Sequence, residues 1–316
     1  MGYSKNKLSN SKSIYQRVTD YVIEQLKNGS VPWKKGWTCY GPPQNLNSGY
    51  IYHGWNTFFL NNVTACEQYK TPFFLTYNQA LDMGGNVRKG EKGYFVIYWK
   101  NITTEYRALR GGVDGTEEND YPKSRLILKV YTVFNIDQTE GIDFTLPTVQ
   151  PKTAHQKIEA CDLLIKQMPK CPPIRHGGDY ARYLPGMDFI QMPHLEQFHK
   201  PEYYYQTLFH ELVHSTGHPF RLNRSDLEFF VRGDDRYAKE ELVAELGSGY
   251  LCAYTGIEQH IIENSSAYID SWLQRLNNDK TLIIKAASQA QAATNYILNK
   301  GCKEKSEIKD KKNVAV

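Results

Sequence analysis

The chain has 316 residues, of which 41% are hydrophobic, and a formal net charge of +4. This composition excludes an intrinsically disordered chain, and the length accommodates two domains with separate cores. No stretch approaches the ~20 apolar residues of a membrane helix, and the polar N-terminus lacks the apolar segment of a signal peptide. The six cysteines are scattered and form no Cys-x-x-Cys pair. We therefore predict a cytoplasmic protein with reduced thiols and no membrane partner.

The charge is unevenly distributed along the chain. Residues 1–101 contain twelve Lys and Arg against five Asp and Glu, a balance of +7, which leaves −3 for the remainder. A basic N-terminal region beside a mildly acidic remainder predicts a polyanion-binding module joined to a second unit. We expect, in order, a disordered N-terminus, a first domain, a linker, a second domain and a lysine-rich tail, at residues 1–12, 13–146, 147–152, 153–300 and 301–316.

The first domain begins with an amphipathic helix over residues 13–29, whose apolar stripe includes Ile14, Val18 and Leu26 and which Gly29 closes. Turn signals and alternating apolar residues divide the rest of this domain. The expected elements are a short capped helix at 75–85, a basic turn at 86–93, a strand at 94–99, a polar irregular insertion at 101–123 and a strand at 126–135.

Four of the five tryptophans lie in this domain, among tyrosines and lysines. Rings that stack on unpaired bases, with Lys and Arg beside the phosphates, are typical of a surface for single-stranded nucleic acid. The competing interpretation is that these tryptophans form the core, and we favour it for each tryptophan taken singly. The candidate DNA-binding residues are instead those expected at the surface: Lys34, Lys35, Tyr50, Tyr52, Arg88, Lys89 and Lys92.

The most informative motif is His210-Glu211-Leu212-Val213-His214, inside a helix-forming run that has no breaker after Pro201. Residues four apart lie on one helix face, so His210 and His214 can bind one zinc ion while Glu211 reaches a water bound to it. The metal lowers the pKa of that water, and the glutamate takes its proton and later passes it to the leaving group. The motif therefore predicts a hydrolytic zinc site.

A catalytic zinc needs a third protein ligand, and a second acidic helix downstream supplies candidates. Glu241 and Glu245 share a helix face. We predict Glu241 as the ligand and Glu245 as the acceptor of a hydrogen bond from a ligand imidazole, and the reverse assignment stays open. Glu240 points about a third of a turn away, so we expect a solvated charge there. In the related motif with three histidine ligands, His-Glu-x-x-His-x-x-Gly-x-x-His, the third histidine would stand at the position of Phe220. We expect His218 to lie at the helix end and not to bind the metal.

The rest of the second domain is predicted from periodicity and turn signals. We expect helices at 153–167, 266–277 and 279–299, and strands at 179–185 and 188–192 joined by a Pro-Gly turn.

Motifs along both domains resemble those of the ArdC-type antirestriction proteins of conjugative plasmids and related mobile elements. The resemblance runs from about Ser13 to Leu298. It is carried by Val31-Pro32-Trp33, Gly54-Trp55-Asn56, Leu75–Ala80, Arg88–Glu91, Val133–Gly141, Asp188–Pro193, His210–His218, Arg221-Leu222 and Glu240–Glu245. It implies an α+β fold: a small N-terminal α+β domain that binds single-stranded DNA, also found in TraC-type plasmid primases, followed by a zincin-like metallopeptidase domain.

In zincin folds an edge strand above the metal helix binds an extended peptide by main-chain hydrogen bonds. Phe189–Met192 is a candidate for this role, and a purely structural strand is the equal alternative. A donor to the oxyanion is also required, and Tyr237 and Arg182 are the two candidates that we consider.

We consider three functional hypotheses. We favour a two-part protein of a mobile element, in which the basic module holds single-stranded DNA and a zinc peptidase cleaves a protein substrate that the sequence does not identify. Mn²⁺ or Co²⁺ would suit the same ligands. The alternative is a non-catalytic single-strand shield with a structural or vestigial metal site, although such a site would not need Glu211. Nucleic-acid hydrolysis fits less well, because nuclease sites favour carboxylate clusters with magnesium or paired metals.

Overall fold

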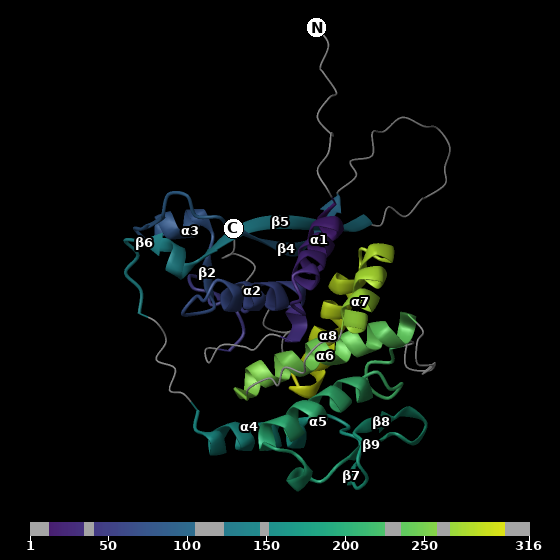
Figure 1. Ribbon diagram of the computed structural model, residues 1–316. Coiled ribbons are helices and arrows are strands. Elements are labelled where there is room, and N and C mark those ends of the chain that lie inside the picture. Colours follow the sequence, from purple (N-terminus) through teal and green to yellow (C-terminus); the bar gives the residue numbers. More distant parts are fainter. Residues whose placement is uncertain are drawn as a thin grey trace, which may run out of the picture.

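The computed structural model describes residues 13–34, 41–104, 123–145, 152–224, 235–257 and 266–300. The first half combines helices with a four-stranded sheet of order β1-β2-β5-β4 and a two-stranded ribbon, β3-β6 (Figure 1). Its elements are α1 (Ile14–Lys27), η1 (Pro32–Lys34), β1 (Gln44–Asn45), α2 (Trp55–Cys66), β2 (Phe73–Leu75), α3 (Tyr77–Asp82), β3 (Asn86–Val87), β4 (Tyr94–Thr104), β5 (Lys123–Asn135), η2 (Ile136–Gln138) and β6 (Thr139–Glu140).

The second half places a small sheet beside a layer of helices. Its strands β7 (Ile174–His176), β8 (Arg182–Leu184) and β9 (Phe189–Met192) have the order β7-β9-β8. Its other elements are α4 (Ala154–Gln167), η3 (Pro185–Met187), η4 (Leu195–Gln197), α5 (Pro201–Ser215), α6 (Asp235–Thr255), α7 (Ser266–Asn278) and α8 (Leu282–Ile297). The mixed α and β content agrees with the predicted class.

Local sequence signals determine where several helices begin. The Ser13 hydroxyl accepts a hydrogen bond from the backbone of α1, which confirms the predicted first helix. Thr76 begins α3 and Thr153 begins α4, and each forms a capping box with a glutamine three residues later. A capping box satisfies two backbone groups at once, so these helix starts are fixed by contacts within four residues.

The β4–β5 hairpin is longer than the sequence predicts. Residues 101–104 and Lys123 belong to its strands, with Thr104 paired with Lys123, so the predicted irregular insertion is wrong at both of its ends. Residues 105–122 lie outside the described part of the chain, as do the expected N-terminal and C-terminal tails and most of the linker.

Of the two roles considered for Phe189–Met192, the peptide-binding edge strand is wrong, and the structure agrees with the alternative of a structural strand. This strand, β9, pairs with β7 on one side and β8 on the other. Its backbone groups are engaged on both sides, so an added peptide strand has no access to them. The outer positions of this sheet belong to β7 and β8.

The two halves share one hydrophobic core. Figure 1 shows α1 and α2 against α7 and α8, and buried side chains of all four helices belong to a single cluster. The rings of Trp33 and Trp272 meet edge to face at 5.1 Å. The Tyr250 hydroxyl donates a 3.0 Å hydrogen bond to the Gly54 carbonyl, across the predicted domain boundary. Among the described residues, no helix is both long and apolar enough to cross a membrane.

Candidate metal centre

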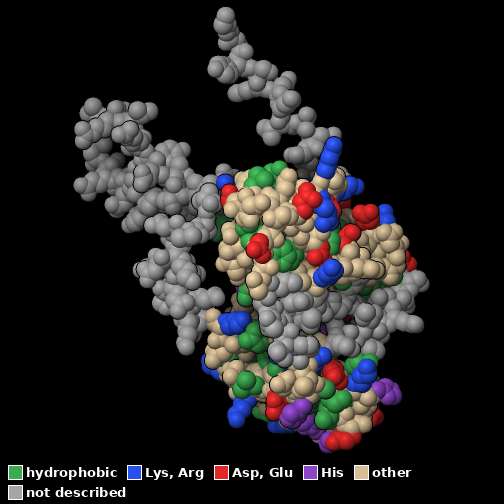
Figure 2. Space-filling model, turned by 90° about the vertical axis from the view of Figure 1, so that its left-hand side faces the viewer, with side chains coloured by type: hydrophobic (Ala, Val, Ile, Leu, Met, Phe, Trp, Pro, Cys, Tyr) green, Lys and Arg blue, Asp and Glu red, His purple; other side chains and the backbone are tan. Residues whose placement is uncertain are grey.

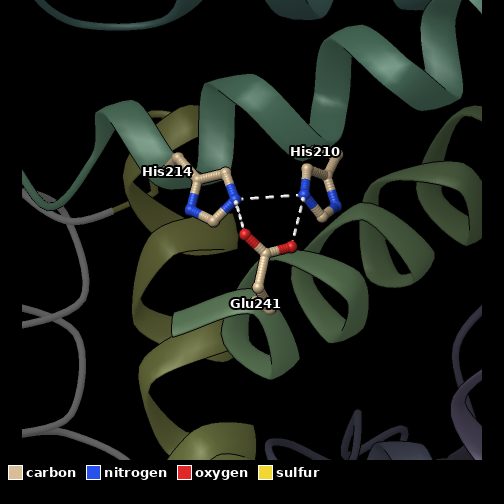
Figure 3. Close-up of side chains that lie close together, drawn as sticks. All are labelled: His210, His214 and Glu241. Atoms are coloured by element: carbon tan, nitrogen blue, oxygen red, sulfur yellow. Dashed lines mark hydrogen bonds and ion pairs between the residues drawn. The ribbon is translucent and has the colours of Figure 1, made fainter. Parts of the chain in front are cut away.

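Two histidines of α5 and a glutamate of α6 point toward one another (Figure 3). The Nε2 atoms of His210 and His214 lie 3.0 Å apart. Glu241 approaches with both oxygens, Oε2 at 3.4 Å from His210 Nε2 and Oε1 at 3.5 Å from His214 Nε2. The period of 3.6 residues in α5 is enough to bring the two histidines together. The position of Glu241 relative to them depends on how α6 packs against α5.

These three side chains fit a divalent transition metal. In tetrahedral zinc sites the metal lies about 2.0–2.2 Å from nitrogen and oxygen, which places two ligand atoms roughly 3.3 Å apart. The distances between ligand atoms here, 3.0, 3.4 and 3.5 Å, bracket that value. Among the described residues, His210, His214 and Glu241 are the one group of three or more His, Cys, Asp or Glu whose ligand atoms converge within 4.8 Å.

Glu240 is a buried partner of the metal centre, so the prediction of a solvated charge is wrong. Its side chain is 2% exposed, and its Oε1 atom lies 3.3 Å from His214 Nδ1. Arg224 donates to both of its oxygens, at 2.5 and 3.0 Å. Burial alone would raise the pKa of Glu240, but hydrogen bonds with His214 and Arg224 lower it. A proton on His214 Nδ1 is donated in a hydrogen bond to this carboxylate and leaves the Nε2 lone pair directed at the other two ligands.

Glu245 lies one turn along α6 from Glu241. The Tyr268 hydroxyl of α7 is 3.1 Å from both of its carboxylate oxygens, and the Trp33 indole donates to the same hydroxyl at 3.3 Å. The charge of Glu245 also helps to raise the pKa of His210. That Glu245 accepts a hydrogen bond from a ligand imidazole stays a prediction. Glu240 is the glutamate that lies beside a ligand imidazole, at His214 Nδ1.

His210 and Glu241 shift each other's pKa in opposite directions. Burial opposes protonation of His210, but the hydrogen bond to Glu241 and the charges of nearby glutamates raise the pKa of His210 to about 9. Burial opposes ionisation of Glu241, but the hydrogen bond from His210 and the charges of both histidines lower its pKa to about 2. His210, His214 and Glu241 would hold a metal ion in their deprotonated forms, so binding would release any proton on the imidazoles.

Glu211 is fixed in place by strand β8. Its side chain is almost buried, at 8% exposure, and its Oε2 atom accepts a 2.6 Å hydrogen bond from the Tyr183 amide. The Tyr183 hydroxyl donates to Asp188 at 2.8 Å and accepts from Arg221 at 3.1 Å. Burial would raise the pKa of Asp188, but the hydrogen bonds from Arg221 and Tyr183 lower it. This cluster ties β8 to the end of α5, and hence to the glutamate.

Three further candidate residues lie around the converging trio. His218 comes after α5 in the chain and lies 4.0 Å from Asp188, outside the trio. Tyr237 donates a hydrogen bond to Glu241 and so helps to lower the pKa of that carboxyl. Arg182 donates to Gln191 at 3.0 Å.

The structure separates the DNA-binding candidates by exposure. Tyr50, Arg88, Lys89 and Lys92 are exposed, and Arg88 pairs with Glu91 at 2.8 Å. Tyr52 is 6% exposed, so its predicted surface position is wrong; its ring packs edge to face against Phe74. Nothing is described for Lys35 or for the Lys34 side chain. On the face of the molecule in Figure 2, Lys and Arg side chains are interspersed with Asp and Glu and form no continuous basic patch among the described residues.

The burial of the tryptophans agrees in two cases with a core role and differs in a third. Trp33 and Trp55 are each 3% exposed, whereas Trp99 is 46% exposed. Two further exposed rings, Tyr98 and Tyr131, were missed by the sequence analysis. No motif marks these two tyrosines. Their exposure could have been predicted only from the register of β4 and β5, which places them on one face of the hairpin.

A helix carrying His-Glu-x-x-His and faced by a glutamate of a second helix defines a zincin-like metal centre. The model of a family described as zincin-like metallopeptidase matches residues 161–289, and that of the N-terminal domain of anti-restriction factor ArdC matches residues 12–134. Together the two models span both halves of the chain.

Solved structures and curated relatives identify the family. The metal-free structure of the antirestriction protein ArdC from plasmid R388 is 36% identical, covers 90% of this chain and 97% of that chain, and has a TM-score of 0.70. Its Mn(II)-bound structure is 34% identical, covers 92% and 99%, and has a TM-score of 0.71. The chain belongs to the ArdC family of antirestriction proteins.

Two relatives extend the comparison. The uncharacterised protein y4eC of Sinorhizobium fredii is 33% identical over 90% of this chain and 91% of its own length. A DNA primase TraC of Escherichia coli is 34% identical over 91% of this chain, which spans only 20% of the primase.

Proposed function

We propose that this protein is a metal-dependent peptidase joined to a single-stranded-DNA-binding module, and that it acts in antirestriction for a mobile element. The observation that carries the proposal is the convergence of His210, His214 and Glu241, together with Glu211, whose charge acts on His210. We propose zinc as the metal, because the ligand set and its spacing suit zinc. Manganese is the second candidate, since a related ArdC structure contains Mn(II).

The residues of the centre have separate roles in this proposal. His210, His214 and Glu241 hold the metal, and Glu240 orients the His214 ring. A divalent ion held there supplies Lewis acidity, which polarises a carbonyl and lowers the pKa of a water. Glu211 accepts the proton of the attacking water on its carboxylate and returns it to the leaving amine. The Tyr183 amide holds that carboxylate in position.

The DNA-binding half of the proposal is supported by three findings. Residues 12–134 match the ArdC N-terminal domain. Residues 1–101 carry a charge balance of +7, which favours phosphate contacts. The match to a DNA primase covers 91% of this chain and so includes this region. We propose single-stranded DNA as the ligand and a protein as the substrate of the peptidase.

One experiment tests both the centre and its activity. We expect the purified protein to hold about one metal ion per chain, as mononuclear zinc sites do, and Glu241→Ala to lose it while Glu245→Ala retains most of it. Glu211→Gln should retain the metal but lose cleavage of a proteome-derived peptide library, because the proton acceptor is gone. Metal is measured by elemental analysis and cleavage by mass spectrometry. Glu196→Gln, at an exposed glutamate, is the matched control.

The alternative is a non-catalytic single-strand shield, and one observation favours it. The Glu211 carboxylate is nearly buried and already engaged by the Tyr183 amide. Metal binding without cleavage in the wild type, or equal cleavage by Glu211→Gln, would overturn the peptidase assignment. Absence of metal from the wild type after zinc and manganese are supplied would overturn the centre itself.

A further inference from the structure

The β4–β5 hairpin carries exposed aromatic rings on a face that the metal centre does not use. In its antiparallel register Tyr98 is opposite Lys129, and Val96 is opposite Tyr131. Because residues alternate between the two faces of a strand, Tyr98, Lys129 and Tyr131 lie on the same face. Tyr98 is 52% exposed and Tyr131 is 45% exposed. We call these three residues the hairpin face.

The opposite face of the hairpin is packed against the helices. Phe95, of the other parity from Tyr98, has its ring 4.9 Å from that of Phe59 in α2, and the Arg17 guanidinium of α1 lies over the Phe95 ring at 4.6 Å. On the same side of the strands as the hairpin face, Val96 and Val133 near the root of the hairpin are buried. Tyr98 and Tyr131 lie further along the hairpin or beside these valines and are exposed.

The charge of the two strands is entirely positive. Residues 94–104 and 123–135 include four Lys or Arg and no Asp or Glu. Of the four, Lys129 is the one whose side chain the structure describes, and it is opposite Tyr98. By contrast, the basic turn at residues 88–92 contains an internal ion pair between Arg88 and Glu91. A polyanion is therefore better matched to the hairpin than to the turn.

We infer that the hairpin face binds single-stranded DNA, with bases stacked on Tyr98 and Tyr131 and a phosphate on Lys129. The inference rests on the proposed DNA-binding function and assigns it a surface. Rings at diagonal positions of a β ladder, about 7–8 Å apart, can each take one base. A duplex hides the faces of its bases, so it would gain only the phosphate contacts.

The test is binding of a fluorescein-labelled oligothymidylate to the full chain, measured by fluorescence anisotropy. We expect Tyr98→Ala/Tyr131→Ala to weaken binding by about tenfold or more, because two stacking contacts are lost. Tyr98→Phe/Tyr131→Phe keeps both rings and should bind like the wild type. Lys129→Ala should lower the slope of log affinity against log salt by about 1.

Matched controls separate the surface from general effects. Tyr77→Ala removes a tyrosine of α3 that is equally exposed, at 46%, and should leave binding unchanged. Lys89→Ala removes an exposed lysine of the basic turn and should change affinity less than Lys129→Ala does. The melting temperature of each variant checks that the hairpin remains folded.

The outcomes distinguish this inference from the proposed function. A wild type that does not bind the oligonucleotide overturns the DNA-binding half of the proposed function. A wild type that binds, together with a Tyr98→Ala/Tyr131→Ala variant of equal affinity, overturns only the hairpin face. Equal affinity of the wild type for a duplex of the same length overturns base stacking as the mode of binding.

Discussion

Glu240 and Glu241 are adjacent in sequence, yet they face different nitrogens of the same ring. Glu241 lies near Nε2 of His214 and Glu240 near Nδ1. A helical wheel separates the two glutamates by about 100°, which on a helix with one buried face would expose one of them. Helix α6 packs against both α5 and α8, and the side chain of Glu240 is 2% exposed while that of Glu241 is 27% exposed. Arg224, from the segment after α5, balances the buried charge.

Glu240→Gln tests this arrangement. The amide keeps the size of the side chain but removes the charge that orients and polarises His214. We expect metal affinity to fall by about 10- to 100-fold, the usual effect of losing a carboxylate that supports a ligand histidine. Affinity is measured by competition with a chelator at a temperature where the variant is folded, since Arg224 loses its buried partner. An affinity equal to that of the wild type would contradict the role of Glu240.

At the scale of elements, the metal centre depends on the close approach of α5 and α6. Gly247 of α6 faces Val213, the residue that precedes His214; a Cβ atom at Gly247 would lie 2.8 Å from Val213 Cγ2. The Ser248 hydroxyl also donates to the Gln206 carbonyl at 2.9 Å. Glycine is otherwise unfavourable in a helix interior, so the close contact explains its presence.

We expect Gly247→Ala to destabilise the protein by about 1–3 kcal/mol, the usual cost of overpacking, although alanine is the better helix former. By moving α6 from α5, it should also weaken metal binding. The measurements are urea unfolding and chelator competition. In the double variant Gly247→Ala/Val213→Ala, the smaller side chain at position 213 makes room for the new methyl group. This variant should regain part of the lost stability and part of the lost metal affinity. A Gly247→Ala protein as stable as the wild type would show that the helices tolerate the contact.

The sequence predicts elements well where the signal is local. The starts of α1, α3 and α4 depend on Ser13, Thr76 and Thr153, and the motif spacing places the two histidines on one face of α5. The order of the strands could not be predicted from the sequence. Strand β7 is three residues long and has no alternating pattern, so nothing in the sequence indicates that it pairs with β9. The burial of Glu240 likewise depends on packing between distant segments.

For the whole molecule, the sequence suggested two domains with separate cores, whereas the described helices share one cluster. The halves share a core because segments far apart in the sequence pack against each other. Thr19 of α1 donates to the Lys280 carbonyl at 2.9 Å, and Gln291 of α8 accepts from the Gly54 amide at 3.0 Å. Such contacts join residues more than 200 positions apart, and no local pattern indicates them. The zincin-like half is therefore stabilised by helices from the N-terminal half.

Trp33→Ala tests whether the halves are stabilised together. Trp33 packs against Trp272 and donates to Tyr268, whose hydroxyl contacts Glu245. Removing so large a buried side chain costs about 3–5 kcal/mol. We expect hydrogen exchange to speed up in α2 and in α8 alike, because a shared core opens as one unit.

The readout is hydrogen exchange measured by mass spectrometry of peptides from both halves. Trp99→Ala removes a tryptophan that is 46% exposed, so it should leave protection nearly unchanged and serves as the matched control. Loss of protection confined to peptides of residues 13–66 would mean that the zincin-like half folds without its neighbour. Loss of protection in both halves would mean that the two halves depend on the same free energy of unfolding. A partner or ligand that stabilises the first half would then also stabilise the helices of the metal centre.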